Sequence, residues 1–526
     1  MTNFHRSLVL GCSALALASC GADEIVSPGT GGNITINNTN APSPTPTPTA
    51  TPTSTLVTPA AGCPTISDPS GLTDAGTTSG PTGEWRVCDL PSRFNASSTL
   101  PYIPGLLYRI NGRVDVGTDG GPAADASDGL SDTNVALTIE PGVILFSSGS
   151  GWMNVNRGNT IEANGTAARP IVFTSRDNVQ GLNTDNSSGQ WGGLVLSGRA
   201  PVTDCIAPGA TPGTVDCERQ VEGAAQPALF GGNDASDDSG SLNYVQIRYS
   251  GFVLSGDNEL QALTTGGVGN GTAISNVMSY NSSDDGVEFF GGRFNVRNLI
   301  VVGAEDDSLD TDTGVKVNMQ NVIAIQRPGA GDTIIEADSN NGLEDQTPRQ
   351  DTKISNATFI HNGAELDQAI RIRGGADFTI VNTVLVDATG GTPCLRLDLD
   401  ETLRATNAGL DDNGPPVFNS FVLDCATDFR DGSGGITAAQ TEGVFNAGTN
   451  NDANFTNTLT MTFVNGANEN GVAVFDAATL APFFTTPTNI GAAYPGNDTW
   501  VQGWTCNSST VAFDAAVTDC TSLPVY

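Results

Sequence analysis

Two pairs of adjacent carboxylates are the residues of this sequence best placed to do chemistry. Asp284-Asp285 precedes Asp306-Asp307 by 22 residues. If 22 residues make one layer of a stacked structure, the pairs lie over each other and repel strongly unless a cation compensates. Ca²⁺ is the expected cofactor, because it takes oxygen ligands. The alternative is a solvent-facing turn, where the repulsion is screened. The candidate ligands are Asp284, Asp285, Asp306, Asp307 and Asp310, with Glu305 and Asp312 nearby as further oxygen donors.

The strands expected after these pairs align as triplets with apolar or small flanks and a charged centre. The triplets are residues 287–289, 309–311, 335–337, 370–372 and 395–397. Because successive side chains of a strand face opposite sides, the flanks point inward and the central residues form an outward column. That column is Glu288, Asp310, Glu336, Arg371 and Arg396. It is a candidate ligand groove for an extended acidic polymer, whose carboxylate or sulfate groups an arginine binds as a fork. The alternative is a solvated sheet face with a weak Glu336–Arg371 pair.

A repeat positions these residues. An Asn followed by small or β-forming residues recurs at intervals of 33, 22, 23, 35, 26 and 37 residues. The seven positions are Asn243, Asn276, Asn298, Asn321, Asn356, Asn382 and Asn419. The short intervals indicate a basic period of 22 to 26, and the long ones indicate that period plus an inserted loop. We predict an all-β parallel β-helix with the Asn residues stacked at one turn, since Asn tolerates left-handed backbone. A β-sandwich array would not keep one Asn register, and the Leu spacing of leucine-rich repeats is absent.

Composition limits the function classes. The chain has 57 acids against 22 bases and a formal net charge of −35, so we expect no nucleic acid as a partner. It has only two His, His5 and His361, and His361 is expected at a strand end as a turn residue. The sequence has no nucleophile elbow, P-loop, dinucleotide fingerprint or zinc motif. A pair of carboxylates for glycoside hydrolysis stays open, because acids are plentiful.

The ten Cys provide evidence about the cellular location of the protein. Cys12 lies in an apolar stretch that ends near Ala18, and this segment is too short to span a bilayer. The eight Cys of the body fall into sequence neighbours, which we expect to form disulfides outside the cytosol, although eight Cys allow 105 connectivities. The neighbours are Cys63 with Cys88, Cys205 with Cys217, Cys394 with Cys425, and Cys506 with Cys520. Metal binding by thiolates is the weaker alternative, since no CxxC is present.

Residues 17–20, Leu-Ala-Ser-Cys, resemble a bacterial lipobox. The resemblance implies cleavage before Cys20 and lipidation of that Cys, and two acyl chains make a stable anchor. Cleavage that leaves Cys20 as a thiol is the alternative. Gly21 follows where an inner-membrane lipoprotein usually has Asp, which implies the outer membrane of a Gram-negative host. A Thr/Pro-rich linker comes next, and it favours extended polyproline II.

The order of strands and motifs resembles a largely uncharacterised family of exported bacterial right-handed parallel β-helix proteins. The resemblance covers about residues 137–505 and rests on LTIEPGVILF at 137–146, RPIVFTS at 169–175, QWGGLVL at 190–196, DDGVEFFGG at 284–292 and DTWVQGWT at 498–505. It implies the fold and often a lipoprotein or surface protein, and it implies little about activity. Some members occur beside TonB-dependent transporters. The Asp pairs and residues 370–373 also resemble segments of polygalacturonases, but the Gly-His-Gly of those hydrolases is absent.

We therefore predict five regions. They are a signal peptide at 1–19, a lipid-anchored linker at 20–62, an N-terminal cap at 63–136, the β-helix at 137–430 and a β-rich C-terminal cap at 431–526. The expected function is a lipoprotein of the outer membrane, periplasmic or surface-exposed, whose Ca²⁺-stabilised β-helix binds glycan or a surface protein. The alternatives are a lyase or glycoside hydrolase acting on an acidic polysaccharide, and an accessory lipoprotein of a TonB-dependent transporter.

Overall fold

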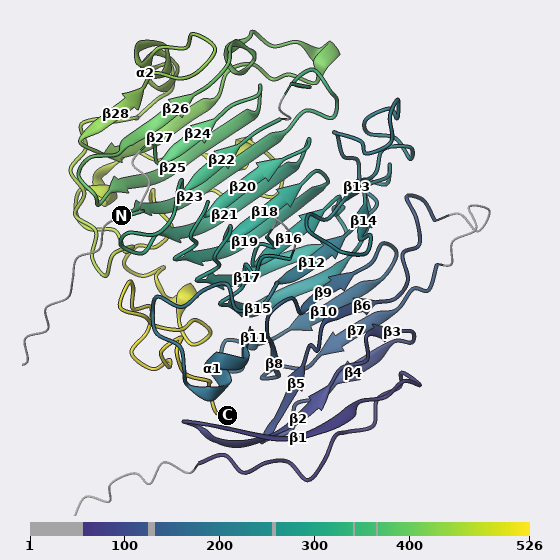
Figure 1. Cartoon of the computed structure of the whole chain (residues 1–526). Coiled ribbons are helices and arrows are strands. Elements are labelled where there is room, and N and C mark those ends of the chain that lie inside the picture. Colours follow the sequence, from purple (N-terminus) through teal and green to yellow (C-terminus); the bar gives the residue numbers. More distant parts are fainter. Residues whose placement is uncertain (1–55, 125–131, 255–258, 340–341, 364–366) are drawn as a thin grey trace, which may run out of the picture. The chain divides into compact units, whose positions relative to one another are not determined.

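Parallel strands stack into two long sheets in the computed structural model (Figure 1). The structure describes residues 56–124, 132–254, 259–339, 342–363 and 367–526. The predicted signal peptide, Cys20 and most of the linker lie outside the described residues. Among the residues that are described, no helix is both long and apolar enough to cross a membrane.

Each coil of the repeat region contributes one long strand to the first sheet and one short strand to the second. The long strands are β15 (Gly240–Arg248), β17 (Ala273–Tyr280), β19 (Arg293–Val302), β21 (Lys316–Ile325), β23 (Asp351–His361), β25 (Asp377–Asp387) and β27 (Val417–Asp424). The short strands are β16 (Leu263–Gly266), β18 (Val287–Phe290), β20 (Leu309–Asp312), β22 (Ile335–Ala337), β24 (Ile370–Ile372), β26 (Pro393–Leu397) and β28 (Thr427–Arg430). Every strand pairs in parallel with its equivalent one coil away, so the fold is the predicted parallel β-helix.

The long strands bend at the repeated Asn. Asn276, Asn298 and Asn321 have φ of 50°, 60° and 62°, a left-handed conformation that Asn tolerates. The amide of Asn298 donates to Asn276 at 2.9 Å, and that of Asn321 donates to Asn298 at 2.8 Å, so the predicted Asn ladder is present. Two positions were aligned wrongly by one residue, because Tyr244 and Ser420 have the positive φ in place of Asn243 and Asn419.

The interior is filled by apolar ladders. Val277 pairs with Leu299, and Leu299 pairs with Val322, as the spacing predicts. All three side chains are fully buried, together with the inward residues of the short strands. Burial of such ladders supplies the main favourable term for a solenoid, in which each coil contacts only its neighbours.

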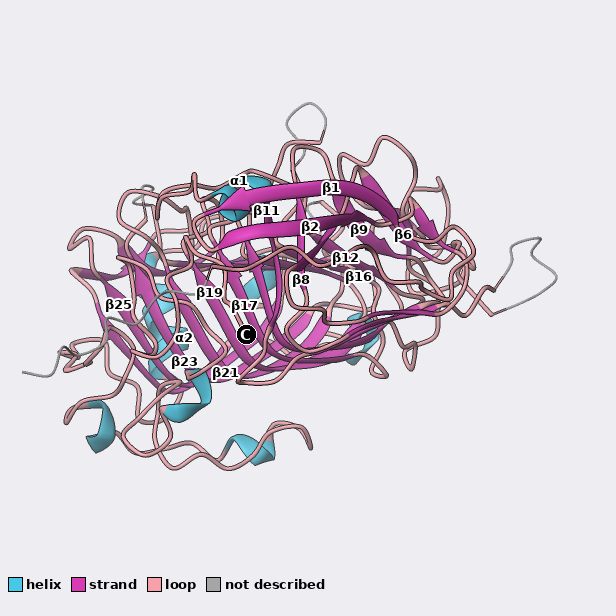
Figure 2. Cartoon of the chain, turned by 90° about the horizontal axis from the view of Figure 1, so that it is seen from below, coloured by secondary structure: helices cyan, strands magenta, loops and turns pink. Residues whose placement is uncertain are grey.

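Parallel pairing already begins inside residues 63–136, which were expected to form a cap. The early coils consist of shorter strands: β2 (Gly83–Asp89), β3 (Arg93–Phe94), β4 (Ser98–Leu100), β5 (Leu106–Arg109), β6 (Arg113–Val116), β7 (Ala136–Ile139), β8 (Ile144–Ser147), β9 (Trp152–Val155), β10 (Thr160–Asn164), β11 (Ile171–Ser175) and β12 (Leu194–Ser197). β1 (Thr73–Gly80) departs from the pattern, because it pairs antiparallel with β2 (Figure 2). The hairpin therefore covers the end of the stack, and the coils precede residue 137.

The C-terminal region differs from the expected β-rich cap. Helix α2 (Ala438–Asn446) does cover the last coil, since its Phe445 packs on Phe418 and Phe421. No strand follows α2 in the described part of the chain, which instead has the short 3-10 helices η3 (Glu469–Gly471), η4 (Ala477–Thr479) and η5 (Thr499–Val501). Low β-propensity in this Gly-, Pro- and Asn-containing stretch is the physical reason.

From α2 onward the chain runs back along the first sheet, drawn in yellow in Figure 1. Asn382 of β25 donates to the Phe475 carbonyl at 3.0 Å. Much nearer the other end of the stack, the buried Arg248 of β15 donates to the Cys520 carbonyl at 2.8 Å. We call residues 448–526 the C-terminal strap. It covers outward apolar side chains of the long strands, such as Ile300 and Ile323.

The four predicted disulfides are present. Cys63 bonds to Cys88, Cys205 to Cys217, Cys394 to Cys425, and Cys506 to Cys520. The first and third join residues close to neighbouring coils, and the second closes an inserted loop. The fourth lies within the C-terminal strap.

Candidate metal centre

An acidic pocket of about 410 Å³ lies beside the short strands β18, β20 and β22. Twelve described residues line it, and ten of them are carboxylates. The carboxylates are Glu222, Glu259, Asp284, Asp285, Glu288, Glu305, Asp306, Asp307, Asp310 and Glu336, and the other two residues are Gln261 and Ser283. All lining atoms that can bind a ligand are therefore neutral or negative.

The pocket follows the predicted column. Glu288 pairs with Asp310, and Asp310 pairs with Glu336. The same register continues to Arg371 and Arg396. The flanking residues of all five triplets are buried in the interior, which leaves the five central side chains on the outer side of the second sheet.

The Asp pairs stack as their spacing predicts, and the two members of each pair differ in role. The Asp285 carboxylate accepts from the backbone N–H of Asp307, one coil on, at 2.9 Å. Asp307 in turn accepts from the backbone N–H of Thr333 at 2.8 Å. Asp285 and Asp307 are buried by these contacts, whereas Asp306 is exposed and Asp284 is partly exposed. The second Asp of each pair therefore links coils, and the first faces the pocket opening.

Two carboxylate oxygens of the column are buried without a hydrogen-bond partner among the described residues. They are Oε2 of Glu288 and Oδ1 of Asp310. Glu288 is only 8% exposed, although it lines the pocket. A buried charged oxygen that has no hydrogen-bond donor costs on the order of several kcal/mol. A cation in the pocket would remove that cost.

The electrostatics of the pocket favour any positive ligand. Burial, followed by repulsion from Asp306 and Glu259, raises the pKa of Asp284 to about 7. Burial and neighbouring carboxylates also raise the pKa of Asp285 and Glu288 well above the ordinary range. Asp307 and Asp310 have raised pKa values for the same two reasons. Without a counter-ion, the pocket must therefore take up protons near neutral pH.

Four sets of three carboxylates have ligand atoms that all lie within 4.8 Å of one another. The sets are Asp284, Asp285 and Asp306; Asp285, Glu288 and Asp310; Asp306, Asp307 and Asp332; and Asp307, Asp310 and Glu336. These clusters can hold a metal ion. Their all-oxygen donor set suits a hard cation such as Ca²⁺ and not a metal that needs His or Cys.

A family model described as a pectate-lyase-like β-helix domain matches residues 128–505. The chain belongs to this family. No curated protein and no solved structure matches the chain. The matched residues include the acidic pocket of this pectate-lyase-like β-helix and the arginines beside it. Membership agrees with the fold and is compatible with a binding or a polysaccharide-acting function.

The arginines of the column face protein carboxylates. Arg371 donates to Glu336 at 2.9 Å and to Asp398 at 2.7 Å, and Arg396 donates to Asp398 at 2.7 Å. Burial alone would raise the pKa of Asp398, but hydrogen bonds from Ser433 and the two arginines hold it below the usual range. The acidic and basic ends of the predicted groove are therefore adjacent, and the guanidinium groups are engaged within the pectate-lyase-like β-helix itself.

Some site residues were not predicted. Glu222 and Glu259 reach the pocket from segments between strands, where no periodicity places them. Arg373 pairs with Asp338 at 3.1 Å and approaches Glu336 at 3.5 Å. Strand alternation could have predicted this residue, because Arg373 follows Arg371 by two residues and such residues face the same side of a strand. Of the predicted extra donors, Glu305 lines the pocket but pairs with Arg327, and Asp312 does not line it.

His361 is a core residue at the end of β23. It is fully buried, with Nδ1 3.5 Å from Asp387 and Nε2 3.3 Å from the Asp332 carbonyl. Burial lowers the pKa of His361, which favours the neutral ring. The pocket of the pectate-lyase-like β-helix does not include it.

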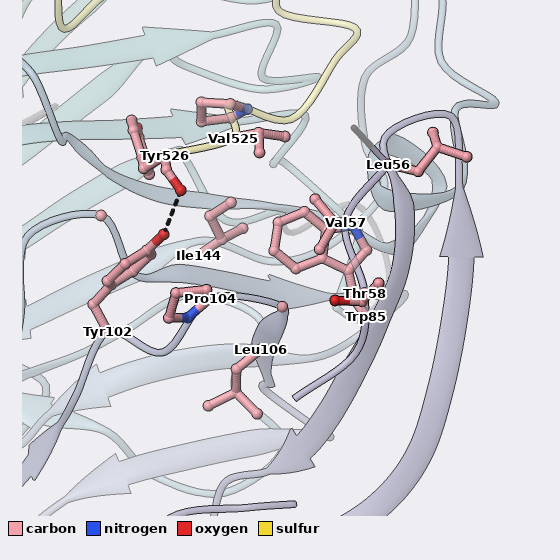
Figure 3. A pocket seen from close by; sticks show the side chains of 13 residues that line it. Leu56, Val57, Thr58, Trp85, Tyr102, Pro104, Leu106, Ile144, Val525 and Tyr526 are labelled. Atoms are coloured by element: carbon pink, nitrogen blue, oxygen red, sulfur yellow. Dashed lines mark hydrogen bonds between the residues drawn. The ribbon is translucent and has the colours of Figure 1, made fainter. Parts of the chain in front are cut away.

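A second pocket, of about 230 Å³, lies near the N-terminal end of the stack (Figure 3). Leu56, Val57 and Trp85 form its apolar side, and the Tyr102 hydroxyl donates to the Tyr526 carbonyl at 3.0 Å. Val57 also bridges to Gly83, so the last residues of the predicted 20–62 linker belong to the folded body. This pocket brings residues 56–58 together with residues 524–526, and none of its lining side chains is charged.

Proposed function

We propose that the chain is an envelope lipoprotein whose β-helix binds Ca²⁺ in the acidic pocket and, through the bound ion, an acidic glycan at the cell surface. One observation carries the proposal: ten carboxylates line one pocket, and two of them, Glu288 and Asp310, each have a buried oxygen with no hydrogen-bond partner among the described residues. The anchor is the lipid on Cys20, and the Thr/Pro linker holds the β-helix away from the outer membrane.

The ion explains how an acidic protein can bind an acidic polymer. Without a cation, a carboxylate of the glycan would be repelled by the carboxylates that line the pocket. Ca²⁺ takes six to eight oxygen ligands, so an ion held by three or four protein oxygens keeps positions for a glycan carboxylate. The pocket opens on the side of Asp306, which is exposed. An extended chain can therefore lie across the coils and reach the ion.

Cleavage of the polysaccharide is the second candidate, and a specific observation favours it. With no cation bound, the pKa of the partly exposed Asp284 is raised to about 7, so this carboxyl can hold a proton at neutral pH, as a general acid must. Asp306, one coil away, also has a raised pKa because of burial and Glu336. A glycoside hydrolase would use such carboxyl groups in the pocket without Ca²⁺, because a bound cation lowers the pKa of neighbouring carboxyls.

The test is a set of acidic and neutral polysaccharides incubated with the purified protein, in Ca²⁺ and in chelator at equal ionic strength. We expect binding of acidic chains that requires Ca²⁺ and is lost in Glu288→Gln with Asp310→Asn. Glu442→Gln is the matched control, because Glu442 is an exposed acid on α2. New reducing or unsaturated ends would favour the enzyme. Binding that is equal in chelator would contradict the proposal.

A further inference from the structure

The carboxylate sets of the acidic pocket repeat with the coil. The set of Asp285, Glu288 and Asp310 becomes the set of Asp307, Asp310 and Glu336 when each member moves by one coil. The pairings Glu288–Asp310 and Asp310–Glu336 fix this shift in the second sheet. The Asp285 carboxylate bonds the backbone of Asp307, which fixes the same shift for the Asp pairs.

The other two sets, which contain the exposed Asp306, obey the same rule. We call them the outer sets and the first two the inner sets. Asp284, Asp285 and Asp306 form one set, and Asp306, Asp307 and Asp332 form the set one coil further on. Each half of the pocket therefore has the same arrangement of donors, and neighbouring coils are about 4.8 Å apart. Asp310 belongs to both inner sets, and Asp306 belongs to both outer sets.

We propose that the pocket binds two divalent cations, stacked one coil apart and bridged by the Asp310 carboxylate. The inference rests on the proposed Ca²⁺ binding and adds its number and arrangement. The lower ion lies between Asp285, Glu288 and Asp310, and the upper ion lies between Asp307, Asp310 and Glu336. Paired metal sites about 4 Å apart with shared carboxylates are a known arrangement in proteins.

The charges of the inner carboxylates favour two ions over one. Glu336 already has guanidinium partners, because Arg371 lies 2.9 Å and Arg373 3.5 Å from its Oε1. The negative charges that remain are those of Asp285, Glu288, Asp307 and Asp310. Two divalent ions neutralise these four carboxylates in full, whereas with one ion two of them must either stay charged in a buried environment, which is costly, or hold protons.

The residues that precede and follow the acids in the column also limit the number of stacked ions to two. On the side of β16, the residue paired with Glu288 is Thr264, which has no charge. On the side of β24, the residue paired with Glu336 is Arg371, whose guanidinium takes the place that a third ion would need. The two unpartnered oxygens of the column belong to these sets. Glu288, with its Oε2, is in the lower set, and Asp310, with its Oδ1, is in both sets.

Calcium stoichiometry on the purified chain, by equilibrium dialysis and by calorimetry, tests the inference. We expect two ions per wild-type chain, one in Glu288→Gln, one in Glu336→Gln, and loss of both tight sites in Asp310→Asn. The control Glu442→Gln should keep two. One ion in the wild type, abolished by Glu288→Gln and by Glu336→Gln alike, would overturn the stacked pair while leaving the proposed function intact.

A second measurement avoids dependence on the folding of the variants. Tb³⁺ and Nd³⁺ occupy Ca²⁺ sites, and a wild-type chain loaded with both should show energy transfer that shortens the Tb³⁺ emission lifetime, since the ions lie one coil apart. An unchanged lifetime at full loading would refute adjacent sites. Absence of any ion binding would refute the proposed Ca²⁺ function together with this inference, so the two failures are distinguishable.

Discussion

Removing the charge of the linking aspartates should uncouple the stability of the fold from Ca²⁺. Asp285 and Asp307 are buried, and each accepts a backbone N–H from the next coil. Asn at both positions keeps an oxygen for that hydrogen bond and removes the repelling charge. We therefore expect Asp285→Asn with Asp307→Asn to melt at the same temperature in millimolar Ca²⁺ and in chelator, whereas the wild type melts higher in Ca²⁺.

The size of the wild-type shift follows from mass action. An ion that binds only the folded chain adds about 2.7 kcal/mol to the free energy of unfolding at a hundredfold excess over its Kd, and two such ions add about twice that. The folded body Thr55–Tyr526 unfolds with an entropy on the order of 1 kcal/mol per kelvin, at about 2.1 cal/mol/K per residue. One ion then raises the Tm by about 3 °C and two ions by about 5 °C.

Differential scanning calorimetry or fluorescence is the assay, with monovalent salt adjusted so that screening is equal in both buffers. In chelator the double variant should be at least as stable as the wild type, because it lacks two buried charges whose pKa values are raised by burial and by their neighbours. Equal wild-type melting temperatures with and without Ca²⁺ would refute the reasoning and leave the acids as an unoccupied polar surface.

Three further predictions concern the anchor, pH and the Asn ladder. Cys20→Ser should abolish fatty-acid labelling and release the protein from the membrane fraction; labelling that persists would disprove the anchor. In chelator, the free energy of unfolding should fall as pH rises from about 4 to about 7, because the folded chain still holds protons, as on Asp284 with a pKa of about 7, that the unfolded chain has released. Urea titrations showing a rise would contradict this. Asn298→Ala should cost about 2 kcal/mol and Asn298→Gly about 1 kcal/mol, since only Ala also strains the positive φ.

The candidate site was predictable where the chain has no insertion between coils. Asp284-Asp285 and Asp306-Asp307 are 22 residues apart, so the period alone stacks them. Strand alternation then places the column, because the inward flanks are apolar or small in every triplet. The column of Glu288, Asp310, Glu336, Arg371 and Arg396 therefore has the predicted register even across the longer intervals.

Periodicity gives no information about segments that leave the repeat. Glu222 and Glu259 enter the pocket from such segments, and their approach depends on tertiary packing that no local pattern encodes. The C-terminal strap is predictable only in part, since its contacts join residues as distant in sequence as Gln246 and Trp504. Asn243 and Asn419 were aligned wrongly because an Asn lies next to the bend in both coils, and the motif is tolerant by one residue.

The column suggests how a β-helix acquires a site without changing its backbone. Every coil offers the same outward position in the second sheet, so the side chain alone decides what that position does. Acids at three successive coils form carboxylate clusters that can hold a metal ion, and the guanidinium of Arg371 at the next coil supplies a fixed positive charge to the same Glu336. The Arg371 guanidinium and the proposed ions thus have the same electrostatic role, because both neutralise negative charge on the column. Exchange of Arg371 for an acid would extend the row by one coil, because the backbone register already continues through Arg396.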